Sequence, residues 1–142
     1  GCGTGLVGVE LRKYGFKNFY GADLSQNLLD LVPNGLYHLL EKADLNKKIN
    51  NEDNKFDAVM CVGTFTYAHV KPLALDEFVR ITKNKGLICF TINEGIHEEY
   101  GFDKKLKELC DTNKCKKLEF FKSQYLASKE VNAWLGLYEV VK

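Results

Sequence analysis

The chain has 142 residues, which is about the length of one domain. Its composition, 45% hydrophobic and 27% charged, excludes a disordered or low-complexity protein. Twenty basic and nineteen acidic residues give a net charge of +1, which does not support nucleic-acid binding through bulk charge. No apolar run approaches the roughly 18 residues of a membrane-spanning helix, so we expect no membrane partner.

Apolar runs alternate with helical patterns along the chain, which predicts an α/β fold with a mainly parallel sheet. The pattern at 5–14 predicts a helix with Leu6, Val7, Leu11 and Tyr14 on its apolar face and Gly15 as its C-terminal stop. The next predicted elements are a strand at 17–22 that ends at Asp23, a helix capped by Ser25, a strand at 36–43 and a surface loop at 46–55. The pattern at 36–43 is ambiguous between helix and strand, and the expected topology favours a strand that ends before Asp44.

The second part has stronger strand signals. Its predicted elements are a buried strand at 56–62, a helix from Pro72 to about Lys83 with Leu73, Phe78 and Ile81 facing the core, a strand at 87–92, a helix near 103–112, and strands near 118–126 and 134–141. Only a turn-sized gap separates the last two strands, so we expect an antiparallel pair. No linker divides the sequence, and we expect a single domain over 1–142.

The first eight residues form a glycine-rich loop that leads into the first predicted helix. They read Gly1-Cys2-Gly3-Thr4-Gly5-Leu6-Val7-Gly8. Without Cβ atoms the loop lets a ligand approach the backbone closely, and the unpaired amides at the helix start attract an anionic or polar group. A tight turn that only packs the helix closely is the structural alternative.

Asp23 stands at the end of the next predicted strand, eighteen residues after Gly5. A carboxylate there can accept hydrogen bonds from both hydroxyls of a ribose, and its structural alternative is to flank the helix that follows Ser25. Together, loop, spacing and carboxylate predict an adenosine-type ligand. The pattern Gly3-x-Gly5-x-x-Gly8 also fits an NAD-binding protein, because Asp23 comes twenty residues after Gly3.

Gly1-Cys2-Gly3-Thr4-Gly5 is the more specific string, and it resembles the motif of class I S-adenosylmethionine-dependent methyltransferases. Further segments resemble the same family. Asp23-Leu24-Ser25 resembles the end of its second strand, and Ala43-Asp44-Leu45 resembles its adenine-binding segment. Phe56-Asp57-Ala58-Val59 resembles its fourth strand, and Cys61-Val62-Gly63 resembles the carboxyl end of that strand, which lies beside the ligand. The closing antiparallel strands are also typical of that family and are not expected of an NAD-binding domain.

This resemblance implies a doubly wound Rossmann-like sheet, mostly parallel, with a C-terminal antiparallel strand pair. It implies S-adenosylmethionine as the cofactor. The cofactor-binding residues that it implies are Gly1, Cys2, Gly3, Gly5, Asp23, Leu24, Asp44, Leu45, Cys61 and Gly63.

The resemblance goes beyond the superfamily: from Gly1 to about Ile92 the chain resembles the methyltransferase-like proteins of the Williams–Beuren syndrome chromosomal region. This chain has Lys83-Asn84-Lys85-Gly86 where that family usually has Lys-Pro-Gly-Gly, which changes only a turn. The family's first strand and the acidic residue before the glycine loop have no counterpart here. We therefore expect an N-terminally truncated fragment in which the first strand of the sheet is missing.

The resemblance predicts transfer of the S-adenosylmethionine methyl group to an unidentified small molecule or protein. The sulfonium already activates the methyl group, so a general base is needed only where the acceptor must lose a proton. Tyr67 and His69 are candidates for that base, while Glu94 and His97 are candidates to line the acceptor pocket; no catalytic residue is assigned. An ordinary loop histidine is the alternative for His69. The alternatives for the whole chain are an NAD-dependent oxidoreductase and a non-catalytic S-adenosylmethionine-binding module.

The cysteines indicate the compartment. Five cysteines are an odd number, and their spacing does not match a zinc site, so we predict no metal and a reducing, cytoplasmic location. The lysine-rich stretch from Lys104 to Lys122 carries interspersed acidic residues and is predicted to be a solvated helix face. Aromatic residues such as Phe120 and Trp134 are expected to belong mostly to the core, and the protein is expected to be a monomer.

Overall fold

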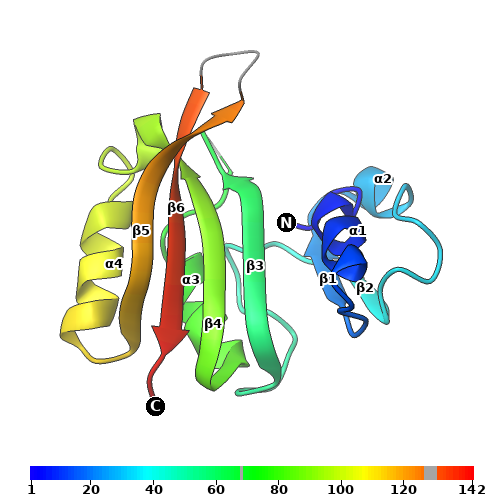
Figure 1. Cartoon of the computed structure of the whole chain (residues 1–142), viewed down its shortest axis with the longest axis horizontal. Coiled ribbons are helices and arrows are strands. Elements are labelled where there is room, and N and C mark those ends of the chain that lie inside the picture. Colours follow the sequence, from blue (N-terminus) through cyan, green and yellow to red (C-terminus); the bar gives the residue numbers. More distant parts are fainter. Residues whose placement is uncertain (68, 127–130) are drawn as a thin grey trace. The chain divides into compact units, whose positions relative to one another are not determined.

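The computed structural model describes residues 1–67, 69–126 and 131–142 and divides the chain into two compact units, Gly1–Ile49 and Asn50–Lys142 (Figure 1). Each unit is described by itself below. None of the helices within those residue ranges is long and apolar enough to cross a membrane.

The first unit pairs two short parallel strands with two helices. In chain order its elements are α1 (Leu6–Lys13), β1 (Tyr20–Asp23), α2 (Gln26–Leu29) and β2 (Leu39–Lys42). The register places Tyr20 opposite Leu39 and Asp23 opposite Lys42. The predicted helix at 5–14 and the strand assignment for the ambiguous segment at 36–43 are both confirmed. β1 begins at Tyr20, three residues later than predicted.

Local chemistry explains the ends of these elements. The Ser25 hydroxyl oxygen accepts a hydrogen bond from the Leu28 amide at 3.4 Å, which confirms the predicted N-cap of α2. Gly15 follows α1 with φ of +90°, a conformation that favours glycine and ends the helix as predicted. Leu6 and Tyr14 were both assigned to the apolar face of this helix, yet both side chains are largely exposed.

The second unit is a four-stranded sheet with two helices (Figure 1). Its elements are β3 (Phe56–Phe65), α3 (Ala74–Ile81), β4 (Thr82–Asn93), the short 3-10 helix η1 (Glu94–Ile96), α4 (Phe102–Asp111), β5 (Cys115–Leu126) and β6 (Val131–Val140). The strand order is β3-β4-β6-β5. β3 and β4 are parallel, and β6 lies antiparallel to both β4 and β5, which confirms the predicted C-terminal strand pair.

Aromatic rings form the centre of this unit. Phe65 at the end of β3 packs against Phe78, Phe90 and Phe102, with ring centroids 6.1, 6.1 and 4.8 Å away. Phe90 stacks on Tyr138 of β6 at 5.5 Å. The strands and both helices therefore contribute to one apolar core, and this core fixes the ends of β3 and β4.

Two predictions for this unit are wrong. The strand at 56–62 was expected to be buried, yet much of it is exposed, and Met60 is 42% exposed. The reason is that β3 is at the edge of the sheet and pairs with β4 alone. The strand is also longer than predicted and ends at Phe65. Leu73 was expected to face the core, yet it is 67% exposed. The reason is that α3 begins at Ala74, so Leu73 precedes the helix face that the core covers.

Candidate cofactor-binding site

The glycine loop lies along the end of β1. The amide of Cys2 donates a hydrogen bond to the Ala22 carbonyl at 2.9 Å, and the amide of Gly5 donates to the Cys2 carbonyl at 2.9 Å. Gly3 and Gly5 have φ of +53° and +87°, in the left-handed region that favours glycine. The glycines that the sequence singled out therefore make a tight turn between the strand edge and α1.

Asp23 ties this loop to α2. Its Oδ2 accepts a hydrogen bond from the Gly3 amide at 2.8 Å, and its Oδ1 accepts one from the Ser25 amide at 2.9 Å. The carboxylate thus has the helix-flanking role that the sequence offered as an alternative. Each carboxylate oxygen has a second lone pair, so it can still accept a hydrogen bond from a ligand hydroxyl.

The surface of the loop has room and donors for a ligand. Apart from Gly3 and its two chain neighbours, no described residue has a heavy atom within 4 Å of the position that a Cβ on Gly3 would take. The amides of Leu6 and Val7 are in the first turn of α1, where the helix itself supplies no acceptor, whereas the Gly8 amide is bonded to the Tyr37 hydroxyl. An open backbone with unpaired, positively polarised amides suits an anionic or polar group.

Tyr37 supports the loop, and the sequence reasoning did not assign it a role. A Cβ on Gly8 would lie 2.8 Å from the Tyr37 hydroxyl, and one on Gly21 would lie 3.0 Å from its ring. The two glycines therefore allow the ring to pack between α1 and β1. Burial is the main cause that raises the pKa of Tyr37 and that of the Cys2 thiol above their usual values, so both groups are neutral at pH 7. In the sequence, the available signal for this role of Tyr37 was the pair of glycines at 8 and 21, which leave space for an aromatic ring.

Asp44 and Leu45 follow β2 at the same edge of the unit as Asp23. The two strands are parallel, and the amide of Ala43 donates to the Asp23 carbonyl at 2.9 Å. The Asp44 Oδ1 accepts a hydrogen bond from the Asn46 amide at 3.0 Å, and its other oxygen is 3.7 Å from Lys47 Nζ. Leu45 is buried and anchors the segment. The first unit therefore brings together the predicted cofactor residues of the glycine loop, the end of β1 and the segment after β2. Of these residues, Leu24 has an exposed side chain.

Cys61 and Gly63 belong to the second unit. The Cys61 side chain is 2% exposed and faces the core, which leaves only its backbone to offer to a ligand. Gly63 has φ of +76°, and its amide donates to Thr91 Oγ1 at 2.8 Å, linking the ends of β3 and β4. A cofactor-binding role for these two residues stays a prediction.

The candidate acceptor-side residues gather where β3 and β4 end. Tyr67 and His69 are exposed, and the Tyr67 ring packs edge-on against Tyr100 at 6.2 Å. Glu94 bonds Lys122 Nζ at 2.5 Å and the Asn132 side-chain amide at 3.1 Å. The hydrogen bond from Lys122 is the main cause that lowers the pKa of Glu94 below its usual value. Glu94 is therefore an ionised carboxylate in which each oxygen has one side-chain partner.

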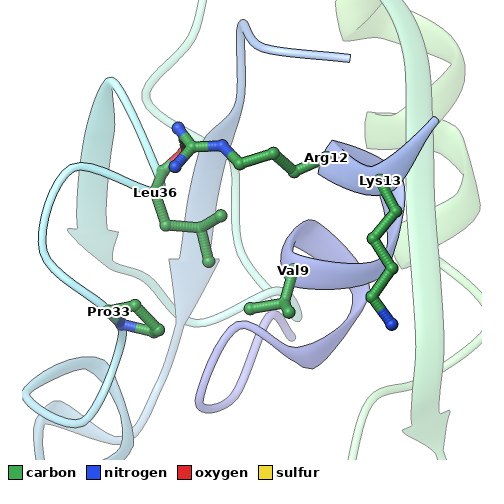
Figure 2. A pocket seen from close by; sticks show the side chains of 5 residues that line it. All are labelled: Val9, Arg12, Lys13, Pro33 and Leu36. Carbon is green, nitrogen blue, oxygen red and sulfur yellow. Dashed lines mark hydrogen bonds between the residues drawn. The ribbon is translucent and has the colours of Figure 1, made fainter. Parts of the chain in front are cut away.

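The first unit also has a surface pocket. Figure 2 shows the side chains that line it, which are Val9, Arg12 and Lys13 on α1 and Pro33 and Leu36 on the segment after α2. Its volume is about 430 Å³. The Arg12 guanidinium donates to the Gly35 carbonyl at 2.8 Å, so it holds the segment to α1. None of the predicted cofactor residues lines this pocket.

Comparisons with known proteins show the family and the fold of this chain. Residues 1–90 match the model of the methyltransferase domain family. Methyltransferase-like protein 27 of Homo sapiens is 38% identical over 92 residues, which are 63% of this chain and 37% of the human protein. The chain thus matches little more than a third of that relative's length.

Solved structures show the same fold. An S-adenosylmethionine-dependent methyltransferase from Listeria monocytogenes, described as putative, aligns with a TM-score of 0.79 and 11% identity, over 100% of this chain and 88% of that one. The N-methyltransferase NodS of Bradyrhizobium japonicum aligns with a TM-score of 0.73 and 15% identity, over 100% and 83% of the two chains. The predicted Rossmann-like methyltransferase fold is therefore confirmed. Because the family model matches well over half of its residues, the chain belongs to the methyltransferase domain family.

Proposed function

We propose that this chain binds S-adenosylmethionine and transfers its methyl group to an acceptor that is not yet identified. The observation that carries the proposal is the joint geometry of the first unit: an open glycine loop, unpaired amides of α1, and the Asp23 carboxylate at the end of β1. Family membership supports the same activity.

The residues present fit this cofactor. The amides of α1 and the open surface at Gly3 suit its polar amino-acid end. The remaining lone pairs of Asp23 suit the two ribose hydroxyls, and Asp44 with the Leu45 amide offers an acceptor and a donor for the adenine edge. When bound, the cofactor would supply a methyl group already activated by the sulfonium, so the protein mainly has to bind, orient and exclude water.

Isothermal titration calorimetry of the chain tests the binding step. We expect S-adenosylhomocysteine and S-adenosylmethionine to bind, and NAD not to bind. Heat with NAD and none with S-adenosylhomocysteine would support the oxidoreductase alternative.

Turnover needs a second experiment. The chain is incubated with S-adenosylmethionine carrying a labelled methyl group and with amine, hydroxyl and thiol compounds. We expect label to appear in one of these classes. Tight binding of S-adenosylhomocysteine without any transfer would support the alternative of a non-catalytic binding module.

A further inference from the structure

His97 stands at the end of the second unit where ligands bind in parallel α/β sheets. β3 and β4 are parallel, so their carboxyl ends share one edge, and η1 and His97 directly follow β4 there. In such sheets ligands bind outside the carboxyl ends of the strands. The imidazole therefore lies on the side of this unit where an acceptor is expected.

Two aromatic rings fix the position of this imidazole. The His97 ring centroid lies 5.4 Å from Phe120 and 5.1 Å from Trp134. Phe120 and Trp134 are themselves stacked at 5.0 Å, with 2° between their planes. The imidazole is half-buried against this pair, so its ring nitrogens have restricted directions.

Asp103 gives the imidazole a carboxylate neighbour. Asp103 is in the first turn of α4, and its amide donates to the His97 carbonyl at 3.2 Å. Among the side chains that the structure describes, its Oδ1 is the buried oxygen without a hydrogen-bond partner. Buried polar atoms are nearly always paired, and catalytic hydrogen bonds often tighten only when the ligand binds. This oxygen is therefore free to accept an N–H, and the His97 imidazole, whose charged form the Asp103 carboxylate favours, can supply one.

Burial leaves the His97 imidazole neutral at pH 7. Burial is the largest effect and lowers the pKa of His97 below its usual value, while the carboxylates of Asp103 and Glu98 act in the opposite direction. Lys122 Nζ lies 5.8 Å from the indole centroid of Trp134 and is paired with Glu94. The lowered pKa of Glu94 makes its carboxylate a weaker base, whereas a neutral imidazole readily accepts a proton.

We propose that His97, oriented by Asp103, takes the proton that a nitrogen or hydroxyl acceptor loses when it is methylated. This inference rests on the proposed function. The acceptor's lone pair forms the new bond to the methyl carbon, the carbon–sulfur bond breaks with its electron pair left on sulfur, and the acceptor's proton moves to the free ring nitrogen of His97. Asp103 is the positioning residue: in the complex with the acceptor, its free Oδ1 accepts a hydrogen bond from the other ring nitrogen and stabilises the imidazolium that forms.

The first test needs neither cofactor nor acceptor. Trp134 is the only tryptophan in the chain, and protonated histidine quenches indole fluorescence, so the emission of Trp134 reports the charge of His97. We expect a transition with a midpoint below about 6.5, the value of free histidine. His97→Gln should abolish the transition, and Asp103→Asn should lower the midpoint by about 0.5 pH unit or more, because the carboxylate favours the imidazolium.

Glu99→Gln is the matched control, since Glu99 is exposed on the same segment. It should leave the midpoint unchanged, and circular dichroism checks that each variant is folded. If Asp103→Asn leaves the midpoint where it is, the pair is not coupled and the proposal is wrong.

The second test measures transfer. Labelled methyl transfer is compared for amine and phenol compounds and for a thiol that is ionised at the assay pH. We expect His97→Gln to lower transfer to the amine or phenol about 100-fold and to leave transfer to the thiolate unchanged, because a thiolate has no proton to lose. Equal loss for all compounds would indicate a structural role only.

The calorimetry separates the two proposals. Failure of S-adenosylhomocysteine to bind contradicts the proposed function, whatever the fluorescence shows. Binding together with an uncoupled His97 contradicts only the present inference.

Discussion

Asp23→Ala is the substitution that tests the candidate site most directly. The change removes the acceptor of two charge-assisted hydrogen bonds, from the Gly3 amide at 2.8 Å and the Ser25 amide at 2.9 Å. A bond to a charged group contributes about 1.5–3 kcal/mol, and both bonds are only part-buried, so we expect the first unit to lose roughly 2–4 kcal/mol of stability. Loss of the ribose acceptor should weaken the binding of S-adenosylhomocysteine by a similar free energy, which raises Kd roughly 30- to 700-fold.

Two measurements separate these effects. Amide hydrogen exchange by NMR reports Gly3 and Ser25 individually, and calorimetry reports the affinity for S-adenosylhomocysteine. Asp23→Asn should have an intermediate effect, because the asparagine carbonyl can accept from one amide while its NH2 group faces the other. Asp30→Ala is the matched control, since Asp30 is exposed and accepts from the Gln26 side chain. Faster exchange with unchanged affinity would refute the ribose role, and no change in either would refute the whole account of Asp23.

Two further predictions concern the second unit. Gly136→Ala should destabilise it by about 1–3 kcal/mol or more, because the new Cβ would lie 2.4 Å from the Phe90 ring; a chemical denaturation midpoint that does not fall would contradict this packing. Burial opposes the charge of Lys105, but its hydrogen bonds to Asp76 and Glu108 outweigh burial and raise the pKa of Lys105 above its usual value. The stabilisation from this raised pKa is therefore present at neutral pH and is lost as pH rises past the usual pKa of lysine. Lys105→Met should lower the free energy of unfolding by about 1–2 kcal/mol at pH 7 and by much less near pH 12. Urea denaturation at both pH values measures this difference.

Lys105 also corrects an expectation about its helix. The lysine-rich stretch was predicted to be a solvated face, and Lys104 and Lys107 are exposed as expected. The Lys105 side chain is only 11% exposed, because it lies between Asp76 of α3 and Glu108 of its own helix. Charge composition cannot show this, since it contains no information on which helix packs beside which.

The sequence by itself determined the elements and the position of the glycine loop. Periodicity placed α4 and the antiparallel strands, and Ser25 and Gly15 marked helix ends, because capping and backbone preferences act within a few residues. The glycine spacing with Asp23 located the candidate site for the same reason: a turn, a helix start and a strand end are local features.

Tertiary structure alone decided which faces are covered and which side chains meet. The exposure of Leu73 and Met60 depends on where a helix begins and on how many neighbours a strand has. The support of the loop by Tyr37, and the meeting of His97 with Trp134 and Asp103, join residues distant in sequence or on different elements. Such contacts arise from packing and register, which no local pattern encodes, because the same apolar or charged residue fits a core or a surface until its neighbours are in place.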